Sequence, residues 1–362
     1  MFSPHPNGRS DHRNGAYTLN TSFFETRHEA HETIGHPPQQ EETLPDPLLL
    51  LGQWLIQMRL RLTVDRAGFR SRAVLLDGGE RAAYLERPGD EENPGPPILV
   101  LPGMSTSARY MALRISYLAH TFIKRRIVIM ELPHHGLNAS RAPDFTKNAI
   151  HQAEVAQYTL RFADAIGLNP PFDTLGYSYG GGLGALIQLQ QPERVRKLVL
   201  IAPFLPSLST PDFLHMLAEG KWREIHGWES YQEMVGFFAS WLGMNRRNKP
   251  PAFLLRAIHA RRAEQYTPGH FSRLFESIRS SMDAETVAPL PKKPAGEPVP
   301  EVLILAGERD RCCDVHKMNP LAEALGADKS CVHVLSAGHS FADRVGKSVF
   351  DISRDTVESF LR

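Results

Sequence analysis

The sequence contains little cysteine, no marked excess of either charge and no hydrophobic run long enough to span a bilayer. Its three cysteines are an odd number, and Cys312 and Cys313 are adjacent. A disulfide framework is therefore not expected, and the pattern favours a reducing compartment. The 41 lysines and arginines stand against 40 aspartates and glutamates. No global field would therefore attract nucleic acid or an anionic membrane, although local patches have to be judged separately.

The uncharged run over residues 48–58 would measure about 16 Å as a helix, whereas bilayer hydrocarbon is roughly 30 Å thick. This segment is too short to cross a membrane. The N-terminus also lacks the basic start and apolar run of a secretory signal. We therefore predict a cytoplasmic protein that associates with membranes at most peripherally.

The first 46 residues are polar, rich in histidine and interrupted by proline. Such a composition buries too little apolar area to offset the entropy of ordering, so we predict a disordered tail over 1–46. From 47 to 66 the spacing of Leu48, Leu51, Leu55, Met58 and Leu62 alternates between three and four residues. That spacing predicts an amphipathic helix, which could dock on the body or lie on a membrane surface.

Short strand patterns alternate with helical patterns from about residue 70 onward. Two half-buried strands flank the turn at 77–79 and form a predicted hairpin. Five apolar runs follow, PPILVLPG, RRIVIMELP, FDTLGYS, RKLVLIAPF and EVLILAG, which are typical of buried parallel strands. Helical patterns separate them at 108–121, 150–166 and 179–190. The sequence therefore predicts an α/β fold with a doubly wound, mostly parallel sheet.

The alternation stops between 204 and 298, where the next buried strand is delayed beyond an ordinary connection. This interval holds three of the four tryptophans, Trp222, Trp228 and Trp241, and many phenylalanines and methionines. We predict an inserted helical cap over 204–298, while 67–203 and 299–362 form the core.

The stretch LGYSYGG places Ser178 between Gly176 and Gly180, directly after a predicted strand and before a predicted helix. A serine on such a sharp turn has a strained backbone, and the flanking glycines leave room for the chain segments that cross there. We expect Ser178 to be a nucleophile, which needs a histidine as base and an acid that orients the histidine.

Both partners are available downstream at the ends of predicted strands. Asp310 lies in the loop Gly307-Glu308-Arg309-Asp310 after the buried run EVLILA, with Asp314 as the nearest substitute. His339 follows SCVHVLSAG, whereas His333 falls within that strand. The order serine, aspartate, histidine resembles the α/β-hydrolase superfamily, and its layout is similar to capped esterases and lipases of the monoacylglycerol-lipase type.

This resemblance implies Ser178 as nucleophile, Asp310 as orienting acid and His339 as general base and acid. It also implies an oxyanion hole formed by the main-chain N–H groups of Met104 and Tyr179. We further expect Gly103, Tyr177 and Phe204 to lie against the substrate.

Two motifs depart from the family pattern. Pro102 precedes Gly103 where many relatives have histidine, which raises the question of what supports the oxyanion loop. Relatives often read D-x-P-G-H-G-x-S after the next strand, but this chain reads ELPHHGLNAS, with Glu131 and His134 in place of aspartate and glycine. We interpret His134 and His135 as structural or pocket-lining residues.

A serine nucleophile argues against haloalkane dehalogenase or epoxide hydrolase chemistry, which uses aspartate. The sequence thus predicts hydrolysis of carboxylic esters through an acyl-enzyme, with an apolar or lipid acyl group under the aromatic cap and no metal or organic cofactor. Carbon–carbon bond hydrolysis, acyl transfer and a noncatalytic ligand receptor are the alternatives. The expected partner is a small-molecule ester or lipid, and the helix at 47–62 offers a peripheral membrane contact.

Overall fold

The computed structural model describes residues 46–77, 79–92, 95–104, 106–133, 135–138, 151–218, 231–265, 300–342 and 346–362. The predicted tail, apart from residue 46, lies outside these residues. The same holds for His134, Trp222, Trp228 and much of the predicted cap.

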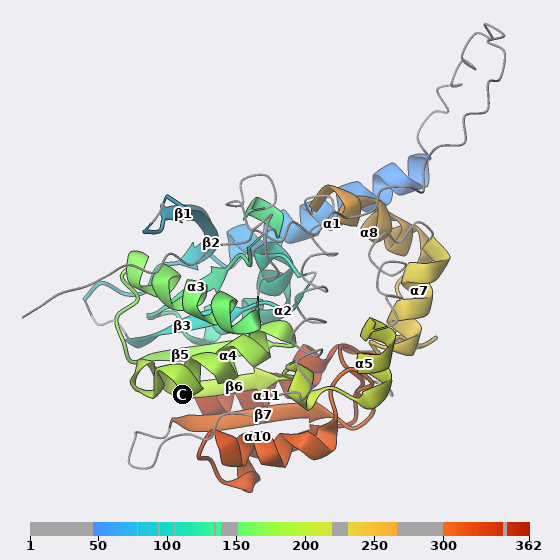
Figure 1. The fold of residues 1–362 in the computed structure, drawn as a ribbon. Helices are drawn as coiled ribbons and strands as arrows, with labels where there is room; N and C mark the ends of the chain where they lie inside the picture. The colour runs from blue at the N-terminus through green and yellow to red at the C-terminus, as the bar shows by residue number, and fades with distance from the viewer. Residues whose placement is uncertain are drawn as a thin grey trace, which may run out of the picture. The chain divides into compact units, whose positions relative to one another are not determined.

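Eight strands form a single sheet with the order β1-β2-β4-β3-β5-β6-β7-β8 (Figure 1). The β1–β2 and β2–β4 pairs are antiparallel, and every other neighbouring pair is parallel. All of the apolar runs predicted as buried strands lie in the parallel part. The strands are β1 (Arg70–Leu75), β2 (Arg81–Arg87), β3 (Gly95–Leu101), β4 (Arg125–Met130), β5 (Phe172–Tyr177), β6 (Val195–Ile201), β7 (Glu301–Gly307) and β8 (Val332–Leu335).

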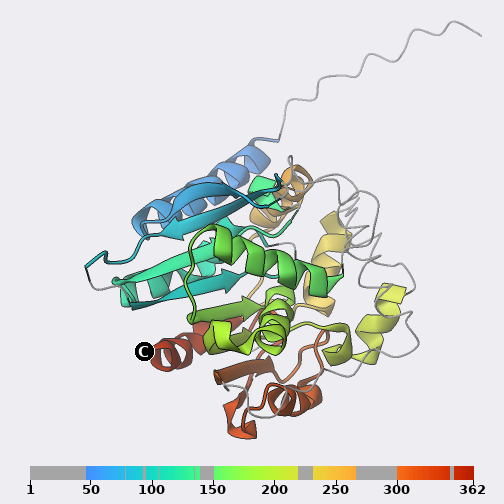
Figure 2. The same ribbon diagram turned by 60° about the vertical axis from the view of Figure 1, so that its left-hand side comes forward.

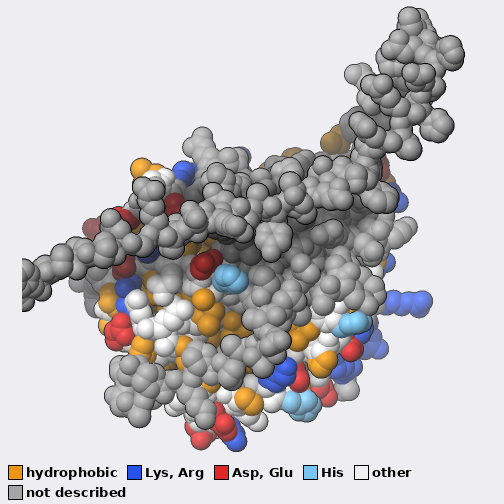
Figure 3. Space-filling model, in the orientation of Figure 1, with side chains coloured by type: hydrophobic (Ala, Val, Ile, Leu, Met, Phe, Trp, Pro, Cys, Tyr) orange, Lys and Arg blue, Asp and Glu red, His pale blue; other side chains and the backbone are white. Residues whose placement is uncertain are grey.

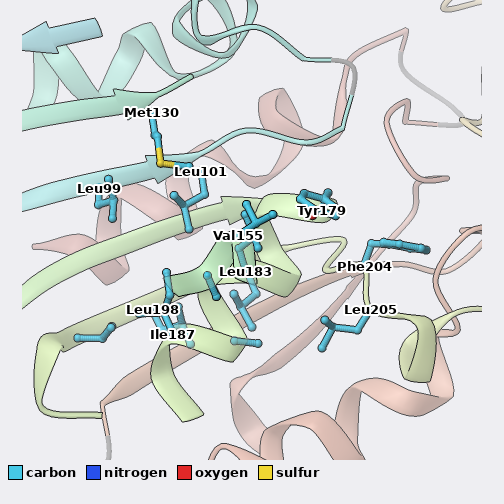
Figure 4. Packing of buried hydrophobic residues seen from close by; sticks show 14 of the residues in the cluster. Leu99, Leu101, Met130, Val155, Tyr179, Leu183, Ile187, Leu198, Phe204 and Leu205 are labelled. Atoms are coloured by element: carbon cyan, nitrogen blue, oxygen red, sulfur yellow. The ribbon is translucent and has the colours of Figure 1, made fainter. Parts of the chain in front are cut away.

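Helices cover both faces of this sheet, as its two-sided burial requires. One apolar cluster joins the sheet to α2 (Ala108–Thr121) and α11 (Val349–Leu361). The cluster on the other face includes α3 (Gln152–Ala165), α4 (Tyr179–Gln190) and α10 (Met318–Ala324), and Figure 4 shows α4 side chains packed against strand residues. The predicted doubly wound fold class is confirmed. The pattern analysis did not find α10 or α11.

Within the described residues, five short 3-10 helices lie in the connections between these elements. They are η1 (Gly136–Asn138), η2 (Pro192–Arg194), η3 (Pro206–Leu208), η4 (Val315–Lys317) and η5 (Lys329–Cys331). Of these, η1 lies in the connection after β4, and η4 follows the loop after β7 that holds Asp310.

The insertion after β6 contributes three described helices, α5 (Pro211–Ala218), α7 (Tyr231–Ser240) and α8 (Ala252–Gln265). Helices α7 and α8 share a small apolar core built on Met234, Phe238, Met244 and Leu255, whereas Phe213 and Met216 of α5 join the larger cluster on the sheet. Figures 1 and 2 show these helices grouped at one end of the sheet. Several of their side chains reach the cavity beside Ser178, so they lie at the carboxyl end of β5.

The segment before the sheet forms α1 (Pro47–Arg66), whose first turn is capped by Asp46 through a 2.9 Å bond from Leu48 N–H to Oδ1. It runs alongside α8 and α2 (Figures 1 and 2). Gly52, Leu60 and Val64 are its buried residues. The leucines that predicted an amphipathic face are therefore turned outward, and the helix docks through the opposite side.

Among the described helices, none is both long enough and apolar enough to cross a membrane. On the face seen in Figure 3, acidic and basic side chains are interspersed over the described surface, as the balanced charge suggests. A buried charge cluster lies inside the fold, where Asp173 of β5 accepts from Arg125 and, at 2.6 Å, from Arg196. The side chain of Asp173 is fully buried.

Candidate active site

Ser178 occupies the sharp turn between β5 and α4 that the sequence predicts. Its φ of 52° and ψ of −119° are strained for a residue with a side chain. A Cβ on Gly180 would overlap the carbonyl oxygen of Leu101, and one on Gly176 would overlap that of Gly180. Glycine is therefore required on both sides of the serine because main-chain atoms pass directly against it.

The structure brings Ser178, His339 and Asp310 into one hydrogen-bonded chain. His339 Nε2 lies 2.8 Å from Ser178 Oγ, and its Nδ1 lies 2.7 Å from Asp310 Oδ2. The other carboxylate oxygen of Asp310 accepts from the N–H groups of Cys312 and Cys313 at 2.8 and 3.0 Å. These main-chain bonds fix the carboxylate so that it orients the imidazole, the arrangement that an activated serine needs.

The alternative acid and base lie apart from this chain of contacts. The carboxylate of Asp314 instead caps η4 by accepting from His316 N–H at 3.0 Å. His333 is exposed in the middle of β8. The geometry therefore favours the pair Asp310 and His339.

The two predicted oxyanion donors are the main-chain N–H groups of Met104, in the loop after β3, and of Tyr179, the first residue of α4. Within the described part of the chain, neither group donates a hydrogen bond to another residue. The oxyanion hole formed by these two groups stays a prediction. Met104 also lines the cavity beside Ser178.

Glu131 explains how the loop before α2 is held without the usual family residues. Its side chain is only 1% exposed, and Oε1 accepts from Ala108 N–H at 2.9 Å in the first turn of α2. Asn138 reinforces this arrangement by donating to the Glu131 carbonyl at 2.9 Å and accepting from Ala83 N–H at 2.9 Å. His135, fully enclosed, places Nδ1 2.8 Å from the Pro133 carbonyl, which is a structural role.

Sequence reasoning noted Glu131 only as a departure from the family pattern and missed Gln152 altogether. Gln152 Nε2 donates to the carbonyl oxygens of Tyr179 at 3.2 Å and of Phe204 at 3.0 Å. It thus joins α3 to the turn behind the nucleophile. Nothing in the local pattern around residue 152 indicates this contact, because it depends on the packing of α3 against α4.

The three predicted substrate-contact residues have different positions. Tyr177 and Phe204 line the cavity, whereas Gly103 is not among its described lining residues, and a Cβ on Gly103 would lie 2.9 Å from the Tyr177 ring. Gly103 is therefore a packing residue rather than a lining one. The Tyr177 hydroxyl shares a hydrogen bond with Ser340 Oγ, which ties it to the loop of His339. Burial raises the pKa of Tyr177, so its hydroxyl stays protonated.

The cavity next to Ser178 has a volume of about 260 Å³ and a mostly apolar wall. The cap supplies part of this wall and the core supplies the rest. Arg114 of α2 is the charged side chain that joins His339 in the described lining. The apolar part of the wall includes Phe204, Phe213, Phe237, Phe238, Leu255 and Phe341.

Cysteine thiols lie beside the acid of the proposed triad. Burial, with the charge of Asp310 adding to it, raises the pKa of the Cys312 and Cys313 thiols well above the ordinary value. Ligand atoms of Asp310, Cys313 and His339 lie within 4.8 Å of one another. His339 Nδ1 already bonds Asp310 and the Cys313 thiol is held protonated, so this group is better suited to positioning the histidine than to binding a metal.

Comparison with known proteins agrees with this fold. The family model described as "alpha/beta hydrolase fold" matches residues 96–343. The chain belongs to the α/β-hydrolase fold family. The family resemblance predicted from LGYSYGG and the downstream order of acid and histidine is thus confirmed, and this α/β-hydrolase can be compared with solved members of its fold.

A structure described as a membrane phospholipase A superposes on this α/β-hydrolase with a TM-score of 0.65 and 22% sequence identity, over 86% of this chain and 92% of that one. A 2-hydroxy-6-oxo-6-phenylhexa-2,4-dienoate hydrolase from a Rhodococcus strain superposes with a TM-score of 0.60 and 18% sequence identity, over 81% of this chain and 99% of that one. At such identities the likeness shows the fold alone. The names of these two proteins indicate different reactions, so the fold by itself does not decide which bond is cleaved.

A curated relative shares a shorter region with this α/β-hydrolase. The dihydrolipoyllysine-residue acetyltransferase component of an acetoin cleaving system from Cupriavidus necator is 26% identical over 125 residues. The match spans 34% of this chain and only 30% of the length of that protein.

Proposed function

We propose that this chain is a serine hydrolase that cleaves carboxylic esters with an apolar acyl group, including esters of lipids. The observation that carries the proposal is the chain of contacts from Ser178 through His339 to Asp310, which opens on a cavity with aromatic and aliphatic walls. A nucleophile, a base and an apolar binding space thus meet at one point.

The geometry supports a two-step acyl transfer. His339 Nε2 takes the proton of Ser178 Oγ as the oxygen attacks the ester carbonyl, and Asp310 holds the imidazole and stabilises its positive charge. The N–H groups of Met104 and Tyr179 stabilise the oxyanion that develops. His339 then gives the proton to the leaving alcohol. A water molecule, deprotonated by the same nitrogen, hydrolyses the acyl-enzyme and returns Ser178 to its starting state.

The cavity wall supports an apolar acyl group as the main source of binding energy. Each methylene that leaves water for such a wall contributes about 0.8 kcal/mol, so six additional methylenes would contribute roughly 5 kcal/mol. Because phenylalanine is the most frequent residue in the described lining, a medium-length acyl chain should be favoured over acetate.

The decisive experiment compares p-nitrophenyl esters from acetate to palmitate with the purified full-length chain, together with labelling by a fluorophosphonate probe. The wild type should be labelled at Ser178, and kcat/KM should rise with acyl length before it declines. Ser178→Ala should lose labelling and several orders of magnitude in turnover, since loss of a serine-hydrolase nucleophile costs about a million-fold.

Ser336→Ala provides a matched control, because this serine is exposed on the loop before His339. It should keep both labelling and turnover. Folded wild type that neither reacts with the probe nor hydrolyses any ester would favour a receptor instead. Cleavage of a vinylogous diketone, or transfer of the acyl group to an added alcohol, at higher kcat/KM than ester hydrolysis would point to the corresponding alternative reaction.

A further inference from the structure

The outward side of α1 is an open apolar surface. Leu48 is 59% exposed, Trp54 57%, Leu51 45%, Leu62 40% and Leu55 37%. At 100° per residue these five side chains fall on one side of the helix, which we call the outer face. Few other large hydrophobic side chains of the described residues are as exposed, so the outer face is a concentrated patch and not a sample of the general surface.

The direction of the outer face is fixed by tight packing on the other side. A Cβ on Gly52 would lie 2.8 Å from Ala257 Cβ and 2.9 Å from the Phe253 carbonyl oxygen, so α1 and α8 approach closely there. Leu60 and Val64 are buried further along. A helix that is apolar on all sides is normally enclosed. Here one side is enclosed against the body, and the outer face is exposed.

Basic side chains stand beside the outer face. The second half of α1 carries Arg59, Arg61 and Arg66, against Asp65 as the acidic residue of the helix. Arg61 and Asp65 form an exposed ion pair of 3.7 Å, which in water offers little stabilisation. Arg59 and Arg66 therefore add positive charge to a surface of leucine and tryptophan. This combination of residues is complementary to a layer that is apolar inside and anionic at its boundary.

The position of α1 connects this surface to the cavity. The helix packs on α8 and on α2, and these two helices contribute Leu255, Ile258, Tyr110 and Arg114 to the cavity wall. A layer that covers the outer face would therefore be separated from these cavity-lining helices only by α1 itself.

We propose that the outer face of α1 inserts into the headgroup region of an anionic lipid bilayer and holds the cap beside the lipids that serve as substrate. This inference deepens the proposed ester hydrolysis and rests on it for the identity of the substrate, while the binding itself is independent of catalysis. A bilayer fits better than the preceding segment of the chain, because the large apolar side chains of residues 1–45 are scattered among polar residues and show no spacing that matches the outer face. The bilayer also accounts for the arginines.

The experiment measures sedimentation of the full-length chain with vesicles of phosphatidylcholine alone and with 30% phosphatidylglycerol as an anionic lipid. We expect binding to the anionic vesicles that weakens at high salt, because screening acts on Arg59 and Arg66. The double variant Leu51→Glu/Trp54→Glu should lower the partition coefficient at least tenfold. Its kcat/KM for a soluble short-chain p-nitrophenyl ester should stay within twofold of the wild type.

Leu75→Glu/Ile123→Glu is the matched control, since these residues are 69% and 65% exposed and lie outside α1. It should bind vesicles like the wild type. Equal binding by the α1 double variant, or no binding of active wild type to anionic vesicles, overturns the proposal without affecting the ester hydrolysis. A third outcome is a wild type that is dimeric in sedimentation velocity and does not bind vesicles, with an α1 variant that is monomeric. This result would instead assign the outer face to a second copy of the chain. Vesicle binding without ester hydrolysis would leave the membrane contact standing and remove the proposed function.

Discussion

Replacing Glu131 with alanine tests whether the loop that carries Met104 depends on a buried carboxylate. The substitution removes the acceptor of the 2.9 Å bond from Ala108 N–H. A hydrogen bond to a buried charged group contributes about 1.5–3 kcal/mol. A carboxylate at the start of a helix adds about 0.3–1 kcal/mol through the helix dipole. The cap from Ser107 is weak, with 3.5 Å between its Oγ and Tyr110 N–H, and offers little compensation.

We therefore expect Glu131→Ala to lower the free energy of unfolding by about 2–4 kcal/mol. Turnover should fall by about 10- to 100-fold, which is less than the 10²- to 10³-fold cost of losing an oxyanion donor outright, because the Met104 N–H is displaced and not deleted. Urea unfolding measures the first quantity, and kcat on a soluble p-nitrophenyl ester measures the second, with KM expected to change little.

Two controls accompany this variant. Glu131→Gln keeps an acceptor oxygen and should lose about 1 kcal/mol or less of stability. Glu323→Ala removes an exposed carboxylate that pairs with Lys329 at 2.7 Å and should change stability by at most about 1 kcal/mol. A urea midpoint of unfolding for Glu131→Ala equal to that of the wild type would refute the structural role of Glu131. A large loss of stability with unchanged kcat would refute the link between Glu131 and the oxyanion loop alone.

Three further predictions concern the core and the turn. Asp173→Ala leaves the Arg125 guanidinium buried without its partner carboxylate and should cost about 3–5 kcal/mol in urea unfolding; a loss below 1 kcal/mol would contradict this. The raised pKa of the Cys312 and Cys313 thiols keeps them protonated in the folded chain, whereas the same thiols in the unfolded chain ionise near pH 8.5. Their contribution to stability is therefore complete below about pH 8.5 and declines as the pH rises toward the folded-state pKa. The Cys312→Ala/Cys313→Ala variant should thus show a shallower fall of the urea midpoint between pH 8 and 10. Gly180→Ala should abolish ester turnover and reduce soluble yield because its Cβ overlaps main-chain oxygen; wild-type kcat in that variant would be incompatible with the turn as described.

The predictions that succeeded rely on local patterns. The helices α2 and α4 begin and end at the residues that apolar periodicity indicated, and the parallel strands follow the continuous apolar runs. Such patterns are readable because each element must present apolar residues at the period of its own backbone. The segment that became α11 has the same kind of pattern, with Val349, Phe350, Val357 and Leu361 buried on the sheet. No helix is predicted for this segment.

The contacts that build the site could not be read from such patterns. His339 lies 161 residues from Ser178 along the chain and 29 from Asp310. The sequence narrowed the candidates through motif context and chain order, but only folding could show that Asp310 faces the histidine while Asp314 caps a helix. Glu131 and Gln152 act through partners on other elements, and a side chain's long-range partner has no periodicity that would reveal it.

The same distinction holds for α1. Its sequence by itself determined that residues 47–66 form a helix and that leucines at steps of three and four share one side of it. Which side would be covered was decided only in the tertiary structure, where Gly52 allows α8 to approach the opposite side closely. Apolar spacing along a helix indicates that one of its faces is hydrophobic. It contains no information about whether that face is covered by another part of the same chain or by a different molecule.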